Sequence, residues 1–388
     1  MSKKNLFILI PLVILAAGTF FFWDKVRSQF AELTTPKCGS GPVLSNLPTA
    51  DSDFEYLIPL GNLSPPQHTI PTDHIYYVFK RENPEVASPT IDVHSPAKAR
   101  FNSVLHIIDI QDGKIRTDDY KISFYPCRGV TLYYDHITGF KGGLADAVKG
   151  KKESCSESHP RPQDTNRYCR ISIDYLAEAG EVIGTAGQST ATGFDFGAID
   201  HRMNPLSYAN SKRHRKDAFY VACPFDLYPE DIKTKIWPRF GAPDKPRAIE
   251  PICGSVAQDK VGTLQGNWFI GDIPADEPES WNKSLALVPD NMDPSIGVVS
   301  FGGNGGSASR AYFEPKSSGL INREFSGVSP GSEIYCYQFD ATMGGLHSGP
   351  ASDRYLIRLN STTELSFEAQ KGGCGEKPSF SSPTTYSR

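Results

Sequence analysis

An uncharged apolar run near the N-terminus is the strongest constraint on this chain. Residues 6–23 read LFILIPLVILAAGTFFFW, 18 residues without a charged side chain. As a helix, such a run nearly spans the ~30 Å hydrocarbon core of a bilayer. Lys3 and Lys4 precede it, which favours a cytoplasmic N-terminus. The sequence therefore predicts a single-pass signal anchor within residues 1–27, with the bulk of the chain extracytoplasmic.

A cleaved signal peptide is the alternative, and it needs a shorter apolar stretch followed by a small-residue cleavage site. Ala16, Ala17 and Gly18 are small, but apolar residues continue through Trp23. Both interpretations send the rest of the chain across the membrane, so they predict the same compartment.

The composition after the anchor predicts β-structure. The remaining ~360 residues exceed one typical domain, so we expect two. The chain contains 34 Gly, 30 Pro, 17 Tyr and 22 Phe, which indicates short strands joined by many turns. Its net charge of −4 argues against a nucleic-acid partner, since such proteins usually carry a basic face. The predicted fold class is all-β: a transmembrane helix, then an antiparallel β-sheet or barrel domain, then a second β-sandwich or barrel domain.

The predicted domain boundaries follow changes in local composition. A polar stalk covers residues 28–52, and the first β-domain covers 53–250, including a Cys-containing loop and an insertion. The second β-domain covers 251–374, and a Ser-, Pro- and Thr-rich tail at 375–388 is expected to be disordered. Gly266-Asn267-Trp268 is a GxW pattern similar to that of lipocalin-like barrels. A small-ligand carrier is therefore one hypothesis for the second domain.

The eight cysteines predict disulfides. None lies in a CxxC pair, which argues against a thiolate zinc site. An even number outside the cytoplasm favours disulfide bonds, although eight cysteines allow 105 pairings. The expected local pairs are Cys155 with Cys169, Cys223 with Cys253, and Cys336 with Cys374.

Three segments of the first β-domain carry the candidate chemistry. Residues 61–79 hold His68, Asp73 and His74 in a Pro-rich turn that leads into a strand. Residues 130–140 read VTLYYDHITGF and place His136 at a strand exit. Residues 179–200 begin with AGEVIGTAG, whose glycines suit hairpin turns, and contain Asp195.

Taken together, residues 55–205 resemble the lysostaphin/LytM-type zinc endopeptidases. The resemblance implies a LytM-like antiparallel β-domain built on a duplicated hybrid motif. In that family a His and an Asp of an HxxxD element bind zinc, and a Tyr-x-His element supplies a further histidine. A glycine-punctuated hairpin then leads into His-x-His, which contains the last zinc ligand and a catalytic histidine.

The sequence departs from this pattern at two places. His68 and Asp73 are five residues apart instead of four, and His-x-His is missing. Asp195 stands where the third zinc ligand would be, and Gly193 where the catalytic histidine would be. The resemblance thus implies His68, Asp73 and Asp195 as the metal ligands, with His136 as the catalytic group. By resemblance the divalent metal would be zinc, although two carboxylates and one imidazole form a harder site, closer to manganese or calcium.

Three interpretations of this site stay open. The residues could be remnants in a degenerate peptidase that binds or regulates at the cell envelope, with an envelope polymer or a partner hydrolase as its partner. They could form a modified metal site in an active hydrolase of envelope peptides or glycans. They could also be purely structural. The sequence contains no GxSxG nucleophile elbow and no phosphate-binding glycine loop.

Overall fold

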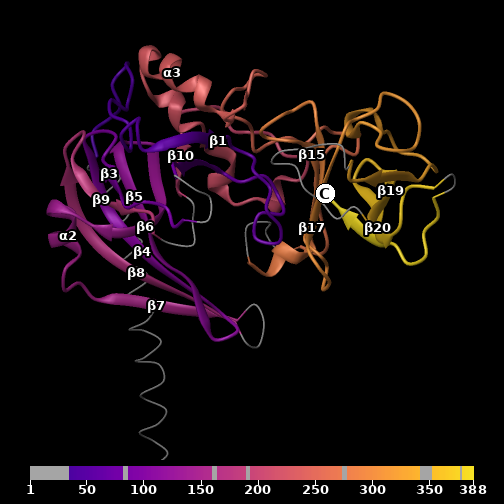
Figure 1. Ribbon diagram of the computed structural model, residues 1–388, viewed down its shortest axis with the longest axis horizontal. Coiled ribbons are helices and arrows are strands. Elements are labelled where there is room, and N and C mark those ends of the chain that lie inside the picture. The colour runs from indigo at the N-terminus through magenta and orange to yellow at the C-terminus, as the bar shows by residue number, and fades with distance from the viewer. Residues whose placement is uncertain are drawn as a thin grey trace, which may run out of the picture.

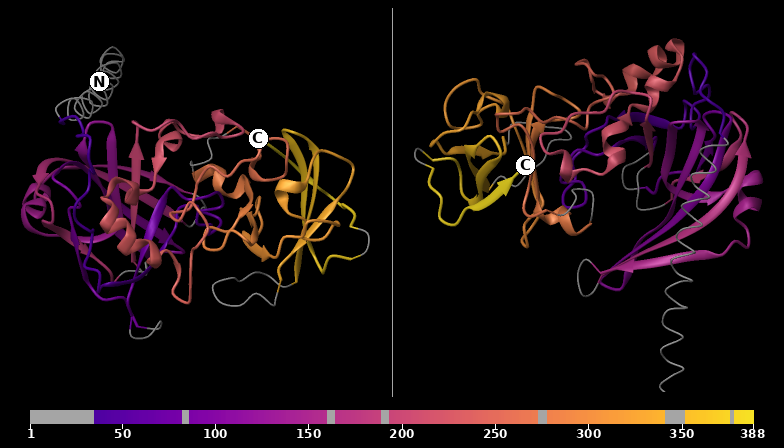
Figure 2. Two further views of the ribbon diagram at one scale, coloured as in Figure 1. Left: turned by 90° about the horizontal axis from the view of Figure 1, so that it is seen from above. Right: turned by 180° about the vertical axis from the view of Figure 1, so that it is seen from behind.

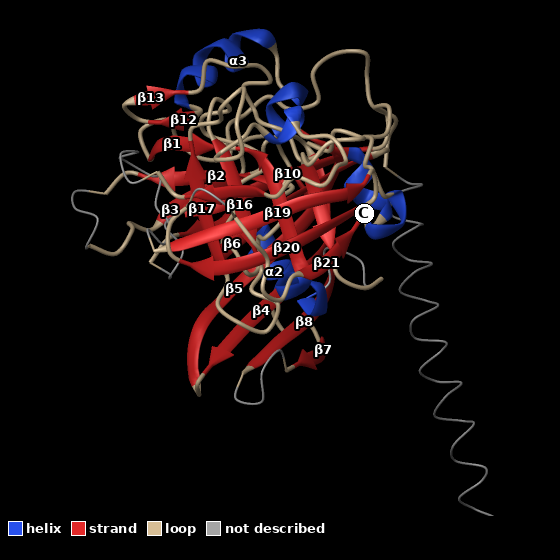
Figure 3. Cartoon of the chain, turned by 90° about the vertical axis from the view of Figure 1, so that its right-hand side faces the viewer, coloured by secondary structure: helices blue, strands red, loops and turns tan. Residues whose placement is uncertain are grey.

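The computed structural model describes residues 35–81, 86–159, 164–188, 193–272, 278–340, 352–375 and 378–388. The described residues are 45% strand and 11% helix, and Figure 3 shows their helices as short pieces beside two large sheets. The predicted anchor at residues 6–23 lies outside the described residues. Within the described ranges, no helix is long and apolar enough to cross a membrane. The fold-class prediction is therefore corrected to two large β-sheets with short helices and no transmembrane element among them.

The first large sheet has 11 strands, all paired antiparallel. Its main path runs β1-β2-β10-β6-β5-β4-β8-β7, and β3, β9 and β11 pair beside this path. The short helix α2 (Gly142–Val148) follows β6. In Figure 1 the long strands β4, β5 and β8, with the edge strand β7 beside β8, form the lower part of this unit. The strands are β1 (Phe54–Ile58), β2 (His74–Phe79), β3 (Ile91–His94), β4 (Ala99–Gln111), β5 (Lys114–Cys127), β6 (Val130–Phe140), β7 (Glu153–Ser158), β8 (Thr165–Ala177), β9 (Val182–Ala186), β10 (Gly193–Asp200) and β11 (Val221–Ala222).

Alternation along the central strands gives this sheet one apolar face. Ile75 and Tyr77 of β2 are fully buried, and Tyr77 stacks on Phe194 of β10 with ring centroids 4.8 Å apart. Burying such a side chain stabilises the fold by about 2–3 kcal/mol. Successive residues of a strand point to opposite faces. His74 of β2 and Asp195 of β10 therefore lie together on the other face.

Residues 35–52, expected as a polar stalk, pack against the first sheet in the structure. Leu44 is 1% exposed within the apolar core. The backbone amides of Val43 and Leu44 both donate to the carbonyl of Leu227, at 2.9 and 3.0 Å. A disulfide joins Cys38 to Cys127 at the end of β5. This segment is an integral part of the first β-unit.

A segment of short elements links the two large sheets and lies along both of them in Figures 1 and 2. These elements are short, and a disulfide between Cys223 and Cys253 links two parts of the segment to each other. Its elements are η1 (Ser211–Arg213), η2 (Lys216–Tyr220), η3 (Pro224–Leu227), α3 (Glu230–Ile236), η4 (Trp237–Arg239), β12 (Gly241–Ala242) and β13 (Lys245–Pro246).

The second large sheet has eight strands in the order β17-β16-β15-β14-β21-β20-β19-β18. Its end strands approach each other, because the amide of Asp340, just after β18, donates to the carbonyl of Tyr312 in β17 at 3.0 Å. The sheet is therefore barrel-like. Its elements are β14 (Gly266–Phe269), η5 (Pro278–Lys283), β15 (Ser284–Pro289), β16 (Gly297–Phe301), β17 (Ser309–Phe313), η6 (Phe325–Gly327), β18 (Tyr335–Gln338), β19 (Asp353–Ser361), β20 (Glu364–Lys371) and β21 (Thr384–Ser387).

Side chains fill the space beneath Trp268, where the carrier hypothesis placed a ligand. Trp268 is fully buried, and its indole N–H donates to the carbonyl of Leu264 at 2.9 Å. Phe367 and Tyr386 pack in the same core, with ring centroids 5.6 Å apart. The tail expected to be disordered supplies β21, which pairs with β20 and β14. Nothing in the described part of this barrel favours the carrier hypothesis.

Four disulfides cross-link the chain. Three are the expected pairs, Cys155–Cys169, Cys223–Cys253 and Cys336–Cys374, and the fourth is Cys38–Cys127. No cysteine is free. Because disulfides persist in oxidising compartments, these four indicate an extracytoplasmic environment.

Candidate metal centre

Four neighbouring strands, β2, β10, β6 and β5, place a cluster of polar side chains on the face opposite the core. Asp195 of β10 pairs with Asp135 of β6, and Gly197 pairs with His74 of β2 on its other side. The cluster thus draws on chain segments more than a hundred residues apart. Its geometry is set by sheet register and not by one continuous motif.

A β-bulge in β6 turns His136 toward this face. Tyr134 and Ile137 are both fully buried in the core, yet two residues, Asp135 and His136, lie between them where strict alternation has one. The pairing of β6 with β5 shifts at this point, so that Lys121 alone lies opposite the two. The backbone of His136 has φ +63°, a conformation that residues other than glycine rarely adopt. Bulges commonly re-aim side chains beside active sites, and this one brings His136 to the polar face.

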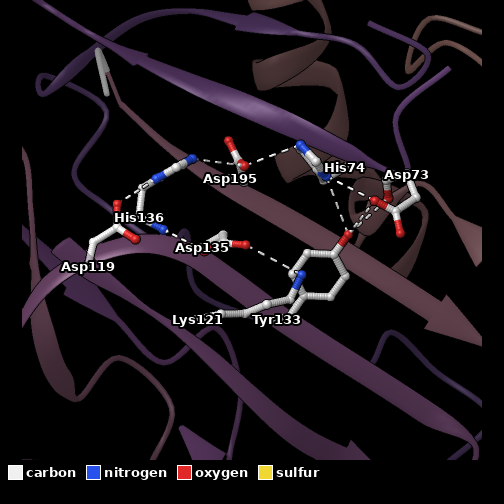
Figure 4. A network of polar contacts seen from close by, with 8 residues as sticks. All are labelled: Asp73, His74, Asp119, Lys121, Tyr133, Asp135, His136 and Asp195. Carbon is white, nitrogen blue, oxygen red and sulfur yellow. Dashed lines mark hydrogen bonds and ion pairs between the residues drawn. The ribbon is translucent and has the colours of Figure 1, made fainter. Parts of the chain in front are cut away.

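Two imidazoles converge on one carboxylate oxygen in Figure 4. Nε2 of His74 lies 3.2 Å from Oδ2 of Asp195, and Nε2 of His136 lies 3.6 Å from the same oxygen. The Asp195 oxygen therefore lies between the two imidazoles, and all three side chains would have to close around an ion to bind it. His74 and Asp195 are nearly buried, whereas the His136 side chain is 33% exposed, so solvent reaches the cluster from its side.

A further carboxylate contacts the other ring nitrogen, Nδ1, of each imidazole. Nδ1 of His74 lies 2.9 Å from Asp73, and Nδ1 of His136 lies 2.7 Å from Asp119. If each Nδ1 carries the proton, both Nε2 atoms present a lone pair toward Asp195. Metal-binding histidines are usually oriented in this way by an outer carboxylate.

Tyr133 fixes the position of Asp73. Its hydroxyl donates to Oδ1 of Asp73 at 2.8 Å, and its ring is almost fully buried. The ring fits because Gly197 lies directly across from it in β10, where a Cβ atom would come within 2.1 Å of the ring. Gly197 is therefore required for the contact between Tyr133 and Asp73.

Lys121 adds one positive charge to the cluster. Its ammonium lies 3.7 Å from the centroid of the Tyr133 ring and 3.5 Å from a carboxylate oxygen of Asp135. The other oxygen of Asp135 accepts the backbone N–H of His136 at 3.0 Å, which helps to hold the bulge. Because the Lys121 side chain is about one-third exposed, its ammonium is open to solvent beside the two histidines.

The carboxylates in the cluster raise the pKa of both histidines and so favour their protonated forms. Burial lowers the pKa of His136, but the carboxylates of Asp195, Asp119 and Asp135 outweigh burial and raise it to about 10. Burial also opposes the charge on His74, whose pKa is nevertheless raised by Asp195 and Asp73. A divalent cation bound here would replace the positive charge that these carboxylates favour on the two imidazoles.

The structure brings together only some of the residues predicted from the sequence. His136 and Asp195 are in the cluster, but Asp73 contacts His74 instead of Asp195. His68 lies beside the cluster, with its ring centroid 5.7 Å from that of His74. Burial and the charge of His74 lower the pKa of His68 to about 4, so this imidazole is neutral at pH 7.

Sequence reasoning did not assign roles to His74 and Asp119. His74 was visible as the first residue of an alternating strand whose other face is apolar, and this was a usable signal. No sequence pattern pointed to Asp119, because only the pairing of β5 with β6 brings it to His136. With His74 in place of Asp73, the donor set has two imidazoles and one carboxylate, which favours zinc over the harder manganese or calcium.

Two groups of three potential ligand residues have donor atoms within 4.8 Å of one another in the described part of the chain, and His74, His136 and Asp195 do not form such a group. Asp119, Asp135 and His136 lie within 4.8 Å of one another, and they belong to the same cluster. Glu153 lies near Cys155 and Cys169, but these cysteines form a disulfide and have no thiolate to offer. The cluster around Asp195 is therefore the better candidate.

Comparisons with known protein families, with curated proteins and with solved structures found no match. The functional argument consequently rests on the geometry of this cluster.

Proposed function

We propose that this protein binds a divalent metal ion at His74, His136 and Asp195 and is a metal-dependent hydrolase outside the cytoplasm. The observation that carries the proposal is the approach of both Nε2 atoms to one oxygen of Asp195, at 3.2 and 3.6 Å. Three protein donors with solvent access are typical of a catalytic zinc site, which keeps one position for water.

Two further observations support a metal at this point. Nε2 of His74 is buried, and its 3.2 Å contact with Asp195 is an ion pair without hydrogen-bond geometry, so a metal ion would give this atom a better partner. The carboxylates of Asp73 and Asp119 already hold the opposite nitrogens, as they would in a loaded site. Two histidines and one carboxylate also suit ferrous iron, so the metal itself must be measured.

The chain's own residues have separable roles in this proposal. His74, His136 and Asp195 hold the ion, which when bound would supply Lewis-acid activation of water. Asp73 and Asp119 orient the imidazoles, and Tyr133 holds Asp73. His68 is neutral and lies beside His74, outside the proposed set of ligands. Lys121 is placed to donate a hydrogen bond to a substrate oxygen.

The proposed substrates are peptides or glycans of the cell envelope. This choice rests on the extracytoplasmic compartment that the disulfides indicate and on the resemblance of residues 55–205 to LytM-type endopeptidases. A single-pass anchor before residue 28 and a location at the envelope belong to the same proposal.

A degenerate peptidase that only binds or regulates is the second candidate. The observation in its favour is Gly193, which stands where the LytM-type pattern has its catalytic histidine. Such a protein could bind a metal and an envelope polymer, or a partner hydrolase, without cleaving anything. Measuring metal content and cleavage separately distinguishes the two candidates.

The first test is metal content after gentle purification of the full chain. We expect about one equivalent of zinc or iron in the unmodified protein, and a fall in thermal stability when a chelator is added. His74→Ala and His136→Ala should lose the metal. His106→Ala is the matched control, because His106 contacts Asp118 at 2.7 Å elsewhere on the first sheet. An unmodified protein without metal, and insensitive to chelator, would contradict the proposal.

The second test is cleavage of purified peptidoglycan, followed by mass spectrometry of the released fragments. Release that requires the metal and is lost in His136→Ala supports the hydrolase. Metal binding and polymer binding without release would favour the degenerate module.

A further inference from the structure

The loop that leads into the metal centre lies against the second β-unit. Residues 59–72 connect β1 to β2 and end one residue before Asp73. At the neck of this loop, Gly61 N–H donates to the Thr72 carbonyl at 2.9 Å, and Thr72 N–H donates back to Asn62 at 3.2 Å. The position of the loop therefore affects Asp73, the next residue, whereas His74 is also held by its pairing with Gly197 of β10.

An apolar contact fastens the loop to the outer face of the barrel. Leu63 is 4% exposed, although it lies in a loop of the first β-unit. It belongs to a small core formed by side chains that point away from the barrel interior. The other members of this core are Ala286, Val288, Ile296, Val298 and Tyr312.

Polar contacts from the barrel hold the loop on both sides of Leu63. The hydroxyl of Thr69, next to His68, lies 3.0 Å from the carbonyl of Trp281 and 2.8 Å from the carbonyl of Pro66 in the same loop, so its one proton is shared between them. The side-chain amide of Asn291 donates to the carbonyl of Pro59 at 2.8 Å. The guanidinium of Arg310 donates to the carbonyl of Leu63 itself. The barrel thus satisfies backbone groups at the start and middle of the loop and a side chain near its end.

The loop has little regular structure of its own to fix its shape. Within it, Ser64 and His68 form one isolated bridge, with backbone hydrogen bonds of 2.8 and 3.1 Å. A segment without extended hydrogen bonding opens easily unless its neighbours hold it. Here those neighbours include the barrel, more than 200 residues away in sequence, as well as Cys253, whose carbonyl accepts the Leu60 N–H at 2.9 Å.

We infer that the C-terminal barrel is a positioning element of the metal centre, which sets the metal affinity by holding the loop at residues 59–72 through Leu63 and Thr69. The inference rests on the proposed function and gives the barrel a role in it. A centre with three protein ligands tolerates little displacement of any of them, because its geometry must be held closely. Loosening the loop moves Asp73, which follows it directly, away from Nδ1 of His74, whereas the pairing of β2 with β10 keeps His74 itself beside Asp195.

The test is the zinc dissociation constant of the full chain, measured by competition with a chromophoric chelator. Leu63→Ala removes the apolar contact, and Thr69→Val removes the hydroxyl while keeping the shape of the side chain. Leu44→Ala is the matched control, because Leu44 is equally buried but packs in the core of the first unit. We expect Leu63→Ala and Thr69→Val to weaken zinc binding by about 10-fold or more, as losses of supporting contacts do. Leu44→Ala should bind zinc as the unmodified chain does.

Hydrogen exchange of the metal-free proteins provides the second measurement. Leu63→Ala and Thr69→Val should speed amide exchange in residues 61–76, and Leu44→Ala should not. Unchanged zinc affinity and exchange in both loop variants, with normal binding by the unmodified chain, would overturn the inference alone. No zinc binding by the unmodified chain would overturn the proposed function, and this role of the barrel with it.

Discussion

Nδ1 of His136 lies 2.7 Å from Oδ2 of Asp119, a carboxylate that is almost completely buried. The pair joins the bulge of β6 to the neighbouring strand β5. Since the Nε2 atom of the same ring faces Asp195, the orientation of this imidazole depends on Asp119. The contact therefore leads to a prediction about metal affinity.

Asp119→Asn should weaken zinc binding by about 10–100-fold without removing a ligand. The amide is similar in size to the carboxylate, but it carries no charge to support the imidazole. Asp118→Asn is the control, because Asp118 is adjacent in β5 and contacts His106 instead. Competition titration of both variants measures the effect, and equal affinities would show that Asp119 does not support a metal ligand.

Zinc affinity should rise with pH. A histidine must lose its proton before it can bind a metal through that nitrogen. The carboxylates around His136 raise its pKa to about 10, and those around His74 raise its pKa as well. At neutral pH zinc therefore displaces up to two protons, and affinity should increase by about 10–100-fold per pH unit.

Competition titrations at pH 6, 7 and 8 check this dependence. His136→Ala, if it keeps residual binding, should show a smaller slope because one fewer proton is released. An affinity independent of pH would mean that the two imidazoles are not ligands.

Gly197→Ala should disrupt the centre through Tyr133. A Cβ atom at this position would meet the Tyr133 ring at 2.1 Å, so the ring must move and release Asp73. Overpacking of this kind typically costs about 1–3 kcal/mol of stability. We also expect weaker zinc binding, because Asp73 then no longer holds His74.

Gly41→Ala is the control for this substitution, since no atom lies within 4 Å of its added Cβ. Chemical denaturation measures stability, and competition titration measures zinc affinity. A Gly197→Ala protein with the stability and affinity of the control would contradict the role assigned to Tyr133.

Local sequence patterns predicted the strands and cross-links better than the site. The aromatic and β-branched run at residues 74–80 predicts a strand, and β2 covers His74–Phe79. The three disulfides expected from sequence proximity are also formed. The tail was predicted wrongly to be disordered, because composition does not reveal that Thr384–Ser387 pairs with β20 and β14.

The candidate site could be predicted only in part, for a physical reason. Alternation from the buried Tyr134 would point His136 into the core, and only the shift in pairing with β5 turns it outward. Asp119 reaches His136 through the same pairing. Such contacts depend on register between strands, and no pattern along a single strand encodes them.

His214, in the segment that links the two large sheets, predicts that the stability of the fold decreases in acid for a reason independent of the metal centre. His214 stacks on Tyr208 with ring centroids 3.8 Å apart, and its Nε2 atom is buried without a hydrogen-bond partner. Burial and the charge of Arg213 lower the pKa of His214 to about 4. In the unfolded chain this histidine titrates near 6.5.

Between pH 6.5 and 4 the unfolded chain therefore binds a proton that the folded chain does not. The stabilising contribution of neutral His214 is fully present above pH 6.5 and is lost as the pH falls toward 4, by at most about 1.4 kcal/mol per pH unit. His214→Phe keeps an aromatic ring against Tyr208 but cannot be protonated. Urea denaturation with chelator present, at pH 7, 6 and 5, should show a shallower loss of stability in His214→Phe than in the unmodified chain. Parallel losses in the two proteins would mean that His214 becomes protonated as readily in the folded state as in the unfolded one.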